Sequence, residues 1–155
     1  MINSDQLVVF SLDNNQYAVQ LSVVERAVRS VEITPLPKAP EIVIGVINLQ
    51  GRIVPVLNMR KRFRLPEREM RLSDQLLIAS AKRRTVALVV DEVCGTVERS
   101  AQEVIDSGEI VPGLEYVTGV IKLADGMLFI HNLDEFLSLD EEESLQAALT
   151  TEAQV

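Results

Sequence analysis

Residues 44–63 read Ile-Gly-Val-Ile-Asn-Leu-Gln-Gly-Arg-Ile-Val-Pro-Val-Leu-Asn-Met-Arg-Lys-Arg-Phe, and this stretch decides the fold. The apolar run Ile44–Leu49 is rich in β-branched residues, and Gln50-Gly51-Arg52 favours a turn before a second apolar run, Ile53–Leu57. Two such runs around a turn predict a β-hairpin. Pro55 has no N–H to donate to a ladder, so we expect its strand at an edge or a bulge, where another chain could bind.

The same pattern returns later in the chain. Gly45 and the residues after it recur from Gly119 onward, and every matched pair has the same separation along the chain. We call this separation the first repeat spacing. A second match pairs Tyr17–Leu21 and the following Val24 with Val86–Val90 and the following Val93, again at one constant separation, the second repeat spacing. Two matches in the same order predict two related β units in one chain.

Two further hairpins are expected from alternating apolar runs. Leu7–Leu12 and Tyr17–Leu21 flank a turn at Asp13-Asn14, where asparagine tolerates left-handed backbone. Leu76–Ala79 and Val86–Val90 flank the basic turn Lys82-Arg83-Arg84. We interpret that turn as a solvated hairpin tip, with a phosphate contact as the alternative.

Helices and connectors are few. Ser22 followed by Glu25 fits a capping box and predicts one or two turns of helix. The polar segment from Arg64 to Asp74 is interpreted as a mobile connector between the repeats. Apolar residues from Leu133 to Ala148 allow a C-terminal helix. We expect residues 141–155 to form an acidic C-terminal tail that is helical or frayed.

Composition indicates a soluble, globular protein in the cytoplasm. The 155 residues include 47% hydrophobic and 25% charged residues, no apolar run of membrane-spanning length and no basic leader at Met1. The single cysteine excludes an internal disulfide and suits a reducing compartment. The net charge of −8 disfavours long-range attraction to nucleic acid and to anionic lipid.

Catalytic and metal-binding patterns are missing. His131 and Cys94 are the only histidine and cysteine, so neither a metal cluster nor a Cys–His nucleophile pair is supported, and we interpret both as packed structural residues. Asp91 and Glu92 are adjacent carboxylates that point to opposite faces of a strand, so we expect them to be solvated. We therefore predict no enzyme activity, no catalytic residues, no metal and no cofactor, and a binding module remains.

The chain resembles the CheW family of chemotaxis coupling proteins over about residues 5–140. The resemblance rests on Phe10-x-Leu12 with Tyr17, on Gly45-Val-Ile-Asn-Leu-x-Gly-x-Ile-Val-Pro-Val-x-x-Met59, on Val89-Val90-Asp91-x-Val93 and on Glu115-Tyr116-x-x-Gly119. It implies a mostly β fold in which two intertwined five-stranded SH3-like barrels share a core, with short helices and a C-terminal helix. Residues 5–140 would form this single domain, and our two repeats would be the barrels.

The family resemblance also implies partners and surfaces. Such a module is a scaffold that couples the cytoplasmic tips of chemoreceptors to the regulatory domain of the histidine kinase CheA, and is recruited to membrane receptor arrays without inserting into the membrane. Carried over by position, the receptor groove between the barrels would include Val24, Gln75, Ala87 and Val93. Ile110, before the second copy of the hairpin, would meet the kinase.

Two positions depart from the family pattern. The family usually carries arginine where this chain has Gln50 and an acidic residue where it has Arg26, and the resemblance suggests that those two residues form an ion pair near the partner surfaces. We expect Gln50 to accept a hydrogen bond from Arg26, so that each change compensates for the other. We include both residues in the predicted receptor-binding set. They favour a dedicated pathway with its own matched partners.

Two alternative functions stay open at this point. One is a CheW-like adaptor of a chemosensory pathway other than chemotaxis. The other is an SH3-like protein that binds nucleic acid through Lys82-Arg83-Arg84 and Arg60-Lys61-Arg62, although the net charge of −8 argues against it.

Overall fold

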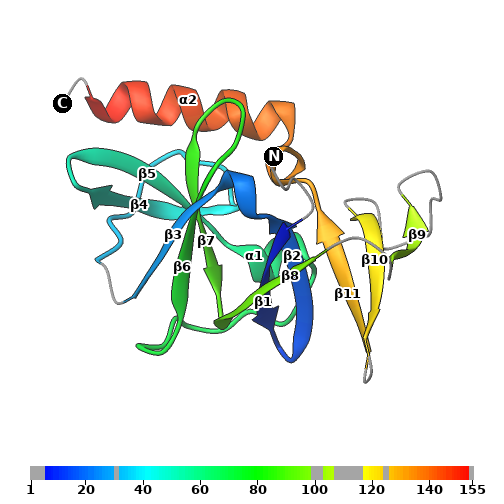
Figure 1. The fold of residues 1–155 in the computed structure, drawn as a ribbon. Helices are drawn as coiled ribbons and strands as arrows, with labels where there is room; N and C mark the ends of the chain where they lie inside the picture. Colours follow the sequence, from blue (N-terminus) through cyan, green and yellow to red (C-terminus); the bar gives the residue numbers. More distant parts are fainter. Residues whose placement is uncertain (1–5, 30–31, 99–102, 107–116, 124–125, 154–155) are drawn as a thin grey trace.

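The computed structural model describes residues 6–29, 32–98, 103–106, 117–123 and 126–153. Ile110 lies outside these residues. Two sheets and two helices make up most of the fold (Figure 1). In chain order the elements are β1 (Gln6–Leu12), β2 (Asn15–Gln20), the 3-10 helix η1 (Leu21–Val23), β3 (Val24–Arg29), β4 (Val43–Leu49), β5 (Arg52–Leu57), α1 (Met59–Arg62), β6 (Gln75–Ser80), β7 (Thr85–Val90), β8 (Glu92–Glu98), β9 (Glu103–Asp106), β10 (Val117–Leu123), β11 (Gly126–His131), the 3-10 helix η2 (Leu133–Glu135) and α2 (Leu139–Ala153).

The chain crosses between the two sheets twice. The terminal sheet has the order β8-β1-β2-β11-β10-β9, and the central sheet has the order β3-β6-β7-β5-β4. After β2 the chain leaves the terminal sheet and pairs β3 with β6; after β7 it leaves the central sheet and pairs β8 with β1. This reciprocal exchange of strands confirms the predicted intertwined, mostly β fold. The terminal sheet gains a sixth strand because β9 pairs with the outer edge of β10.

The register reproduces both repeat spacings. Val56 pairs with Ala87 across β5 and β7, and Ile130 pairs with Ala18 across β11 and β2. Ile130 follows Val56 by the first repeat spacing, and Ala87 follows Ala18 by the second, so the two parallel pairs are equivalent. The halves differ at the outer edge, where an isolated bridge between Thr34 and Val46 takes the place of β9.

Alternating side chains build three apolar clusters. Because successive residues of a strand face opposite sides, Leu76 and Ile78 pack inside the central sheet, whereas Leu77 and Ala79 face a middle cluster. In the same way Leu7 and Val9 pack inside the terminal sheet, while alternate residues of β1 enter the middle cluster. The middle cluster therefore contains side chains of both sheets and is the shared core.

Rings gather in this shared core. Tyr17 of the terminal sheet stacks on Phe63, which follows α1, with ring centroids 4.3 Å apart. Phe136 and the buried His131 contact the Phe63 ring at 5.7 and 4.8 Å. His131 is thus a packed residue, as predicted.

Helix α2 covers one end of the molecule, over the β4–β5 hairpin (Figure 1). Leu145 and Ala148 bury their side chains in the shared core, and Arg84 donates to Glu142 at 2.6 Å. Ser138 caps the helix by accepting from the Glu141 N–H, and Glu141 accepts from the Ser138 N–H in return. The helix is therefore a docked part of the fold.

Three local predictions were wrong. Pro55 lies on β5, which is an inner strand and not an edge. Only Val56 and Leu57 of β5 pair with β7, so the missing N–H of Pro55 removes no hydrogen bond between these two strands. The expected helix after Ser22 is one 3-10 turn, because the following residues pair with β6. Cys94 is exposed, because it is the unpaired residue of a bulge between Val93 and Gly95.

Candidate functional site

The predicted receptor-binding residues fall into two groups with one buried residue between them. Val24 pairs with Ala79 near one end of β6, and Gln75 lies at the other end. Five residues of strand span roughly 13 Å, so these are separate patches. Ala87 is fully buried inside the central sheet, so it supports the surface from below and offers no exposed atoms.

The first group contains Val24, Arg26 and Gln50. Arg26 is exposed on β3, and Gln50 is exposed in the β4–β5 turn with a left-handed φ of 53°. The expected hydrogen bond between them is not among the contacts of the described residues. Instead Arg52, the first residue of β5 after this turn, donates to Glu25 at 2.8 Å. The link between the turn and β3 is thus made by the neighbours of the two predicted residues.

Glu25 is the centre of this link. Its side chain also accepts from the hydroxyl groups of Ser80 at 2.7 Å and Thr85 at 3.4 Å. The hydrogen bond from Arg52, with the bond from Ser80, lowers the pKa of Glu25 to about 2. Glu25 faces outward because it is the unpaired residue of a bulge between Val24 and Arg26, equivalent to the bulge at Cys94.

The second group contains Gln75 and Val93. The Gln75 side-chain oxygen accepts from the Val93 N–H at 2.7 Å, so the structure brings these two predicted residues together. Val93 stands just after the crossing from β7 to β8. Both residues are partly exposed and adjoin a network of ion pairs.

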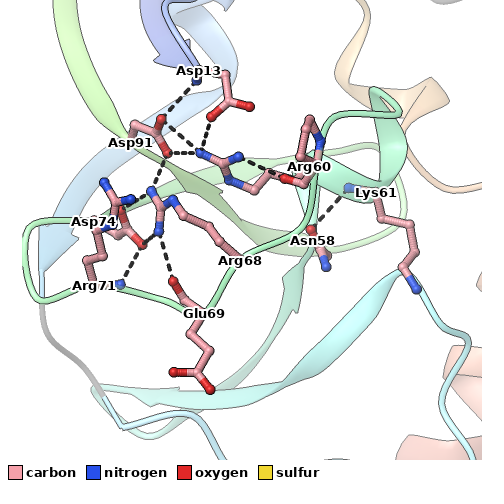
Figure 2. A network of polar contacts seen from close by, with 10 residues as sticks. Asp13, Asn58, Arg60, Lys61, Arg68, Glu69, Arg71, Asp74 and Asp91 are labelled. Carbon is pink, nitrogen blue, oxygen red and sulfur yellow. Dashed lines mark hydrogen bonds and ion pairs between the residues drawn. The ribbon is translucent and has the colours of Figure 1, made fainter.

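This network, shown in Figure 2, joins both sheets to the segment before β6. Arg60 of α1 lies 2.7 Å from Asp13 in the β1–β2 turn and 3.0 Å from Asp91 at the β7–β8 crossing. Arg68 bonds Asp91 at 2.7 Å and Asp74 at 2.8 Å. Two arginines therefore clamp three carboxylates at the junction of the sheets.

The electrostatics of the network follow from these contacts. Burial acts to raise the pKa of Asp74, but hydrogen bonds from Arg68 and from the Arg71 N–H outweigh it and hold that pKa below its usual value. The Arg60 hydrogen bond is the main cause of the lowered pKa of Asp13. Asp13 and Asp74 therefore stay ionised near neutral pH, and their ion pairs with Arg60 and Arg68 stay intact.

Sequence reasoning does not find this network. It predicts a mobile connector over residues 64–74 and a solvated Asp91, yet Arg68 and Asp74 anchor the connector and Asp91 binds two arginines. The repeats could have pointed to the Arg60–Asp13 pair of this network, because each of these two residues has an equivalent in the other half of the chain. They could not have pointed to the rest of the network. The bonds of Arg68 cross 6 and 23 residues and follow from no local pattern.

A cavity of about 430 Å³ lies at the other crossing, where the chain passes from β2 to β3. We call it the crossing cavity. Terminal-sheet residues Gln20, Thr118 and His131 line one side, Lys82 of the β6–β7 turn lines the other, and Val23 precedes the predicted Val24. The cavity thus lies between the two sheets and next to Val24, one residue of the first group.

Each sheet also exposes an apolar residue at an equivalent place. Ile53 on β5 is 57% exposed, and Met127, its repeat equivalent on β11, is 52% exposed. Both stand near the start of the second strand of the repeated hairpin.

A family model described as a CheW-like domain matches residues 6–141. The chain belongs to the CheW family. It is 27% identical to the chemotaxis protein CheW of Treponema pallidum (90% of this chain, 86% of the relative) and 28% identical to that of Bacillus subtilis (92% of each). The crystal structure of the scaffolding protein TtCheW from Thermoanaerobacter tengcongensis matches with a TM-score of 0.78 and 27% identity, over 89% of this chain and 95% of that one. The chain is a CheW-like scaffold protein of chemotaxis signalling.

The basic run Arg60-Lys61-Arg62 of this CheW-like chain is paired with carboxylates of the same chain. Arg60 and Arg62 are held by Asp13, Asp91 and Glu141, and Lys61 lies within 3.6 Å of Glu41. These pairs leave the Arg60-Lys61-Arg62 run little charge for a phosphate backbone, which weakens the nucleic-acid alternative. Within the described residues, no three His, Cys, Asp or Glu side chains are grouped to hold a metal ion. None of the helices in the described part of the chain is long and apolar enough to cross a bilayer.

Proposed function

We propose that this CheW-like chain links a CheA-type histidine kinase to the cytoplasmic tips of chemoreceptors, and that it reaches receptor arrays from the cytoplasm through these contacts. One observation carries the proposal: the two sheets expose Ile53 and Met127 at equivalent places, with the crossing cavity between the sheets. Separate faces allow one scaffold to hold several partners at once. Holding kinase and receptor together lets a receptor conformation bias kinase output without chemistry in the scaffold.

The receptor side of the proposal uses the crossing cavity with Val24, Arg26 and Gln50. The cavity has a mixed lining of apolar and polar side chains, which suits a helical tip with one apolar stripe. Gln75 and Val93 form a second patch held by the ion-pair network, with Ala87 beneath the surface between the patches. In this arrangement the network fixes the second patch through Asp74 and Asp91, which precede Gln75 and Val93 closely in the chain.

The kinase side of the proposal uses the terminal sheet. Met127 is the most exposed large apolar residue among the described residues of that sheet, and the family resemblance assigns the kinase contact to Ile110, which precedes the same hairpin. Apolar residues at the centre of an interface carry most of its binding energy. Met127 and Ile110 are therefore proposed as the kinase face.

The kinase face can be tested with two equivalent substitutions. Titration calorimetry would compare binding of the cognate kinase regulatory domain to the intact chain and to its Met127→Lys and Ile53→Lys variants. We expect Met127→Lys to weaken binding at least tenfold and Ile53→Lys, matched in exposure and position, to change it less than threefold. Unchanged binding in both variants would contradict a kinase face on the terminal sheet.

The receptor side needs its own experiment. Receptors in nanodiscs would be mixed with kinase and scaffold, and both scaffold binding and receptor-controlled kinase activity would be measured. Arg26→Glu should reduce receptor binding about tenfold, because it reverses a charge in the proposed contact, and Lys38→Glu, at an exposed position between β3 and β4, is the control. Equal effects of the two substitutions would point to net charge alone and remove Arg26 from the site.

A further inference from the structure

A second cavity, which shares Lys82, Leu133 and Asp134 with the crossing cavity, lies between the β6–β7 turn and the start of α2. Its volume is about 240 Å³. Its walls are apolar side chains of the core, Leu57, Val86, Leu133 and Phe136, and Lys82 and Arg83 stand among its lining residues. We call it the basic-turn cavity.

Some of the charged residues around this cavity have ion-pair partners and others do not. Its lining holds three cations and two carboxylates, on a chain whose net charge is −8. Arg84 is bound by Glu142 at 2.6 Å and by Gln146 at 2.7 Å, and Asp134 accepts from the backbone N–H of Lys82. Within the described residues, the side chains of Lys82 and Arg83 have no ion-pair partner. An apolar hollow thus has two available cations beside it.

We propose that the basic-turn cavity binds a small amphipathic carboxylate. The apolar part of the ligand packs against Val86 and Phe136, and its carboxylate is bound by Arg83 and Lys82. A guanidinium group matches a carboxylate in geometry, and a bond between ions is stronger than one between neutral groups. Drug-sized ligands occupy pockets of about 300–1,000 Å³, so this cavity suits a smaller molecule of about ten heavy atoms.

The ligand would also contact the docked helix. Leu139 and Glu142 of α2 line the cavity, so the complete site exists only when α2 is in place. A ligand that binds the folded chain alone stabilises it by mass action. Binding should therefore raise the temperature of thermal unfolding as ligand concentration increases.

Octanoate is a suitable probe, because it has ten heavy atoms and one carboxylate. Methyl NMR spectra of the full chain would be recorded during titration with octanoate and, in parallel, with octan-1-ol. We expect saturable shifts at Leu57, Val86 and Leu133, with octanoate binding at least fivefold tighter than octan-1-ol. Arg83→Gln should reduce the octanoate affinity about fivefold and leave octan-1-ol unchanged, while Arg29→Gln, an exposed cation on β3, should change neither.

Three results would overturn the proposal. Equal affinities for octanoate and octan-1-ol would remove the role of the cations, and shifts that do not saturate or that centre on the other two apolar clusters would remove the site. Leu139→Glu gives a third test, since Leu139 is 59% exposed and its replacement should leave the fold intact. It places a negative charge beside the cavity, so octanoate binding that persists unchanged would put the ligand elsewhere.

Discussion

Arg60 and Asp134 occupy equivalent positions in the two halves of the molecule and carry opposite charges. The first repeat spacing separates them, and each is the second residue of a short helix whose preceding asparagine caps it. Arg60 pairs with Asp13 in one hairpin turn, and Asp134 accepts from the N–H of Lys82, which follows Asp13 by the second repeat spacing and lies in the equivalent turn. Each contact joins one sheet to the other. The two halves therefore have a contact at the same place, which is an ion pair in one half and a hydrogen bond from a backbone N–H to a carboxylate in the other.

The first prediction concerns this junction. Arg60→Met should lower the free energy of unfolding by about 2 kcal/mol, because it removes a nearly buried cation that bonds Asp13, Asp91 and the Pro66 carbonyl oxygen. Urea denaturation would measure the loss, with Arg29→Met on exposed β3 as the control. A loss below about 0.5 kcal/mol would mean that the junction depends on the shared core alone.

Much of the fold could be predicted because the repeats are visible in the sequence. The two repeat spacings correctly relate the Val56–Ala87 and Ala18–Ile130 pairs, which no local pattern would connect. Apolar alternation also predicted the strands of the β1–β2, β4–β5 and β6–β7 hairpins, and the repeat predicted those of the β10–β11 hairpin. What it could not predict is where a strand bulges, so Cys94 was wrongly predicted to be packed.

The candidate site was less accessible to sequence reasoning. Family resemblance supplied Val24, Arg26 and Gln50, but Arg52 and Glu25, one or two positions away, make the contact. Moving by one residue along a strand turns the side chain to the opposite face of the sheet. A position matched by family resemblance therefore does not guarantee the same side-chain contact. The Arg68 bonds were missed because charged residues in a loop usually face solvent, and only the fold brings Asp91 to them.

The second prediction concerns Gly45. A Cβ atom at this position would lie 2.3 Å from the Thr34 carbonyl oxygen, which accepts from the Val46 N–H at 2.8 Å. Gly45→Ala should therefore break this bridge and lower the free energy of unfolding by about 2–3 kcal/mol, which urea denaturation would measure. Wild-type stability in this variant would mean that the loop carrying Thr34 can move away without cost.

The third prediction concerns Glu25. Its pKa in the folded chain is about 2, below the ordinary value of 4.5, chiefly because Arg52 donates to it. A lowered folded-state pKa gives stability that is complete above the unfolded pKa and is lost as pH falls from about 4.5 toward 2. Carboxyl ¹³C NMR should show a Glu25 midpoint near 2, which Arg52→Gln raises toward the ordinary value.

Arg26→Gln is the matched control for this titration, because Arg26 is exposed beside Glu25 but does not bond to it in the structure. It should leave the Glu25 midpoint nearly unchanged. A double-mutant cycle of Gln50→Arg with Arg26→Glu should likewise be additive in stability, as expected for residues that do not touch. Strong coupling in that cycle would show that Gln50 and Arg26 do meet.

The last prediction concerns helix α2, which lies almost entirely beyond the part of the chain matched by the family model. Leu145 is fully buried in the shared core, and the helix is also held by the Arg62–Glu141 and Arg84–Glu142 ion pairs. Leu145→Ala should lower the free energy of unfolding by about 2–4 kcal/mol through lost burial and a residual cavity. Ser144→Ala, at an exposed position of the same helix, should stay within about 0.5 kcal/mol and controls for helix propensity. If Leu145→Ala had an equally small effect, α2 would be a loosely attached tail and the stability of the fold would come from the two sheets. The basic-turn cavity would then lack the wall that α2 provides.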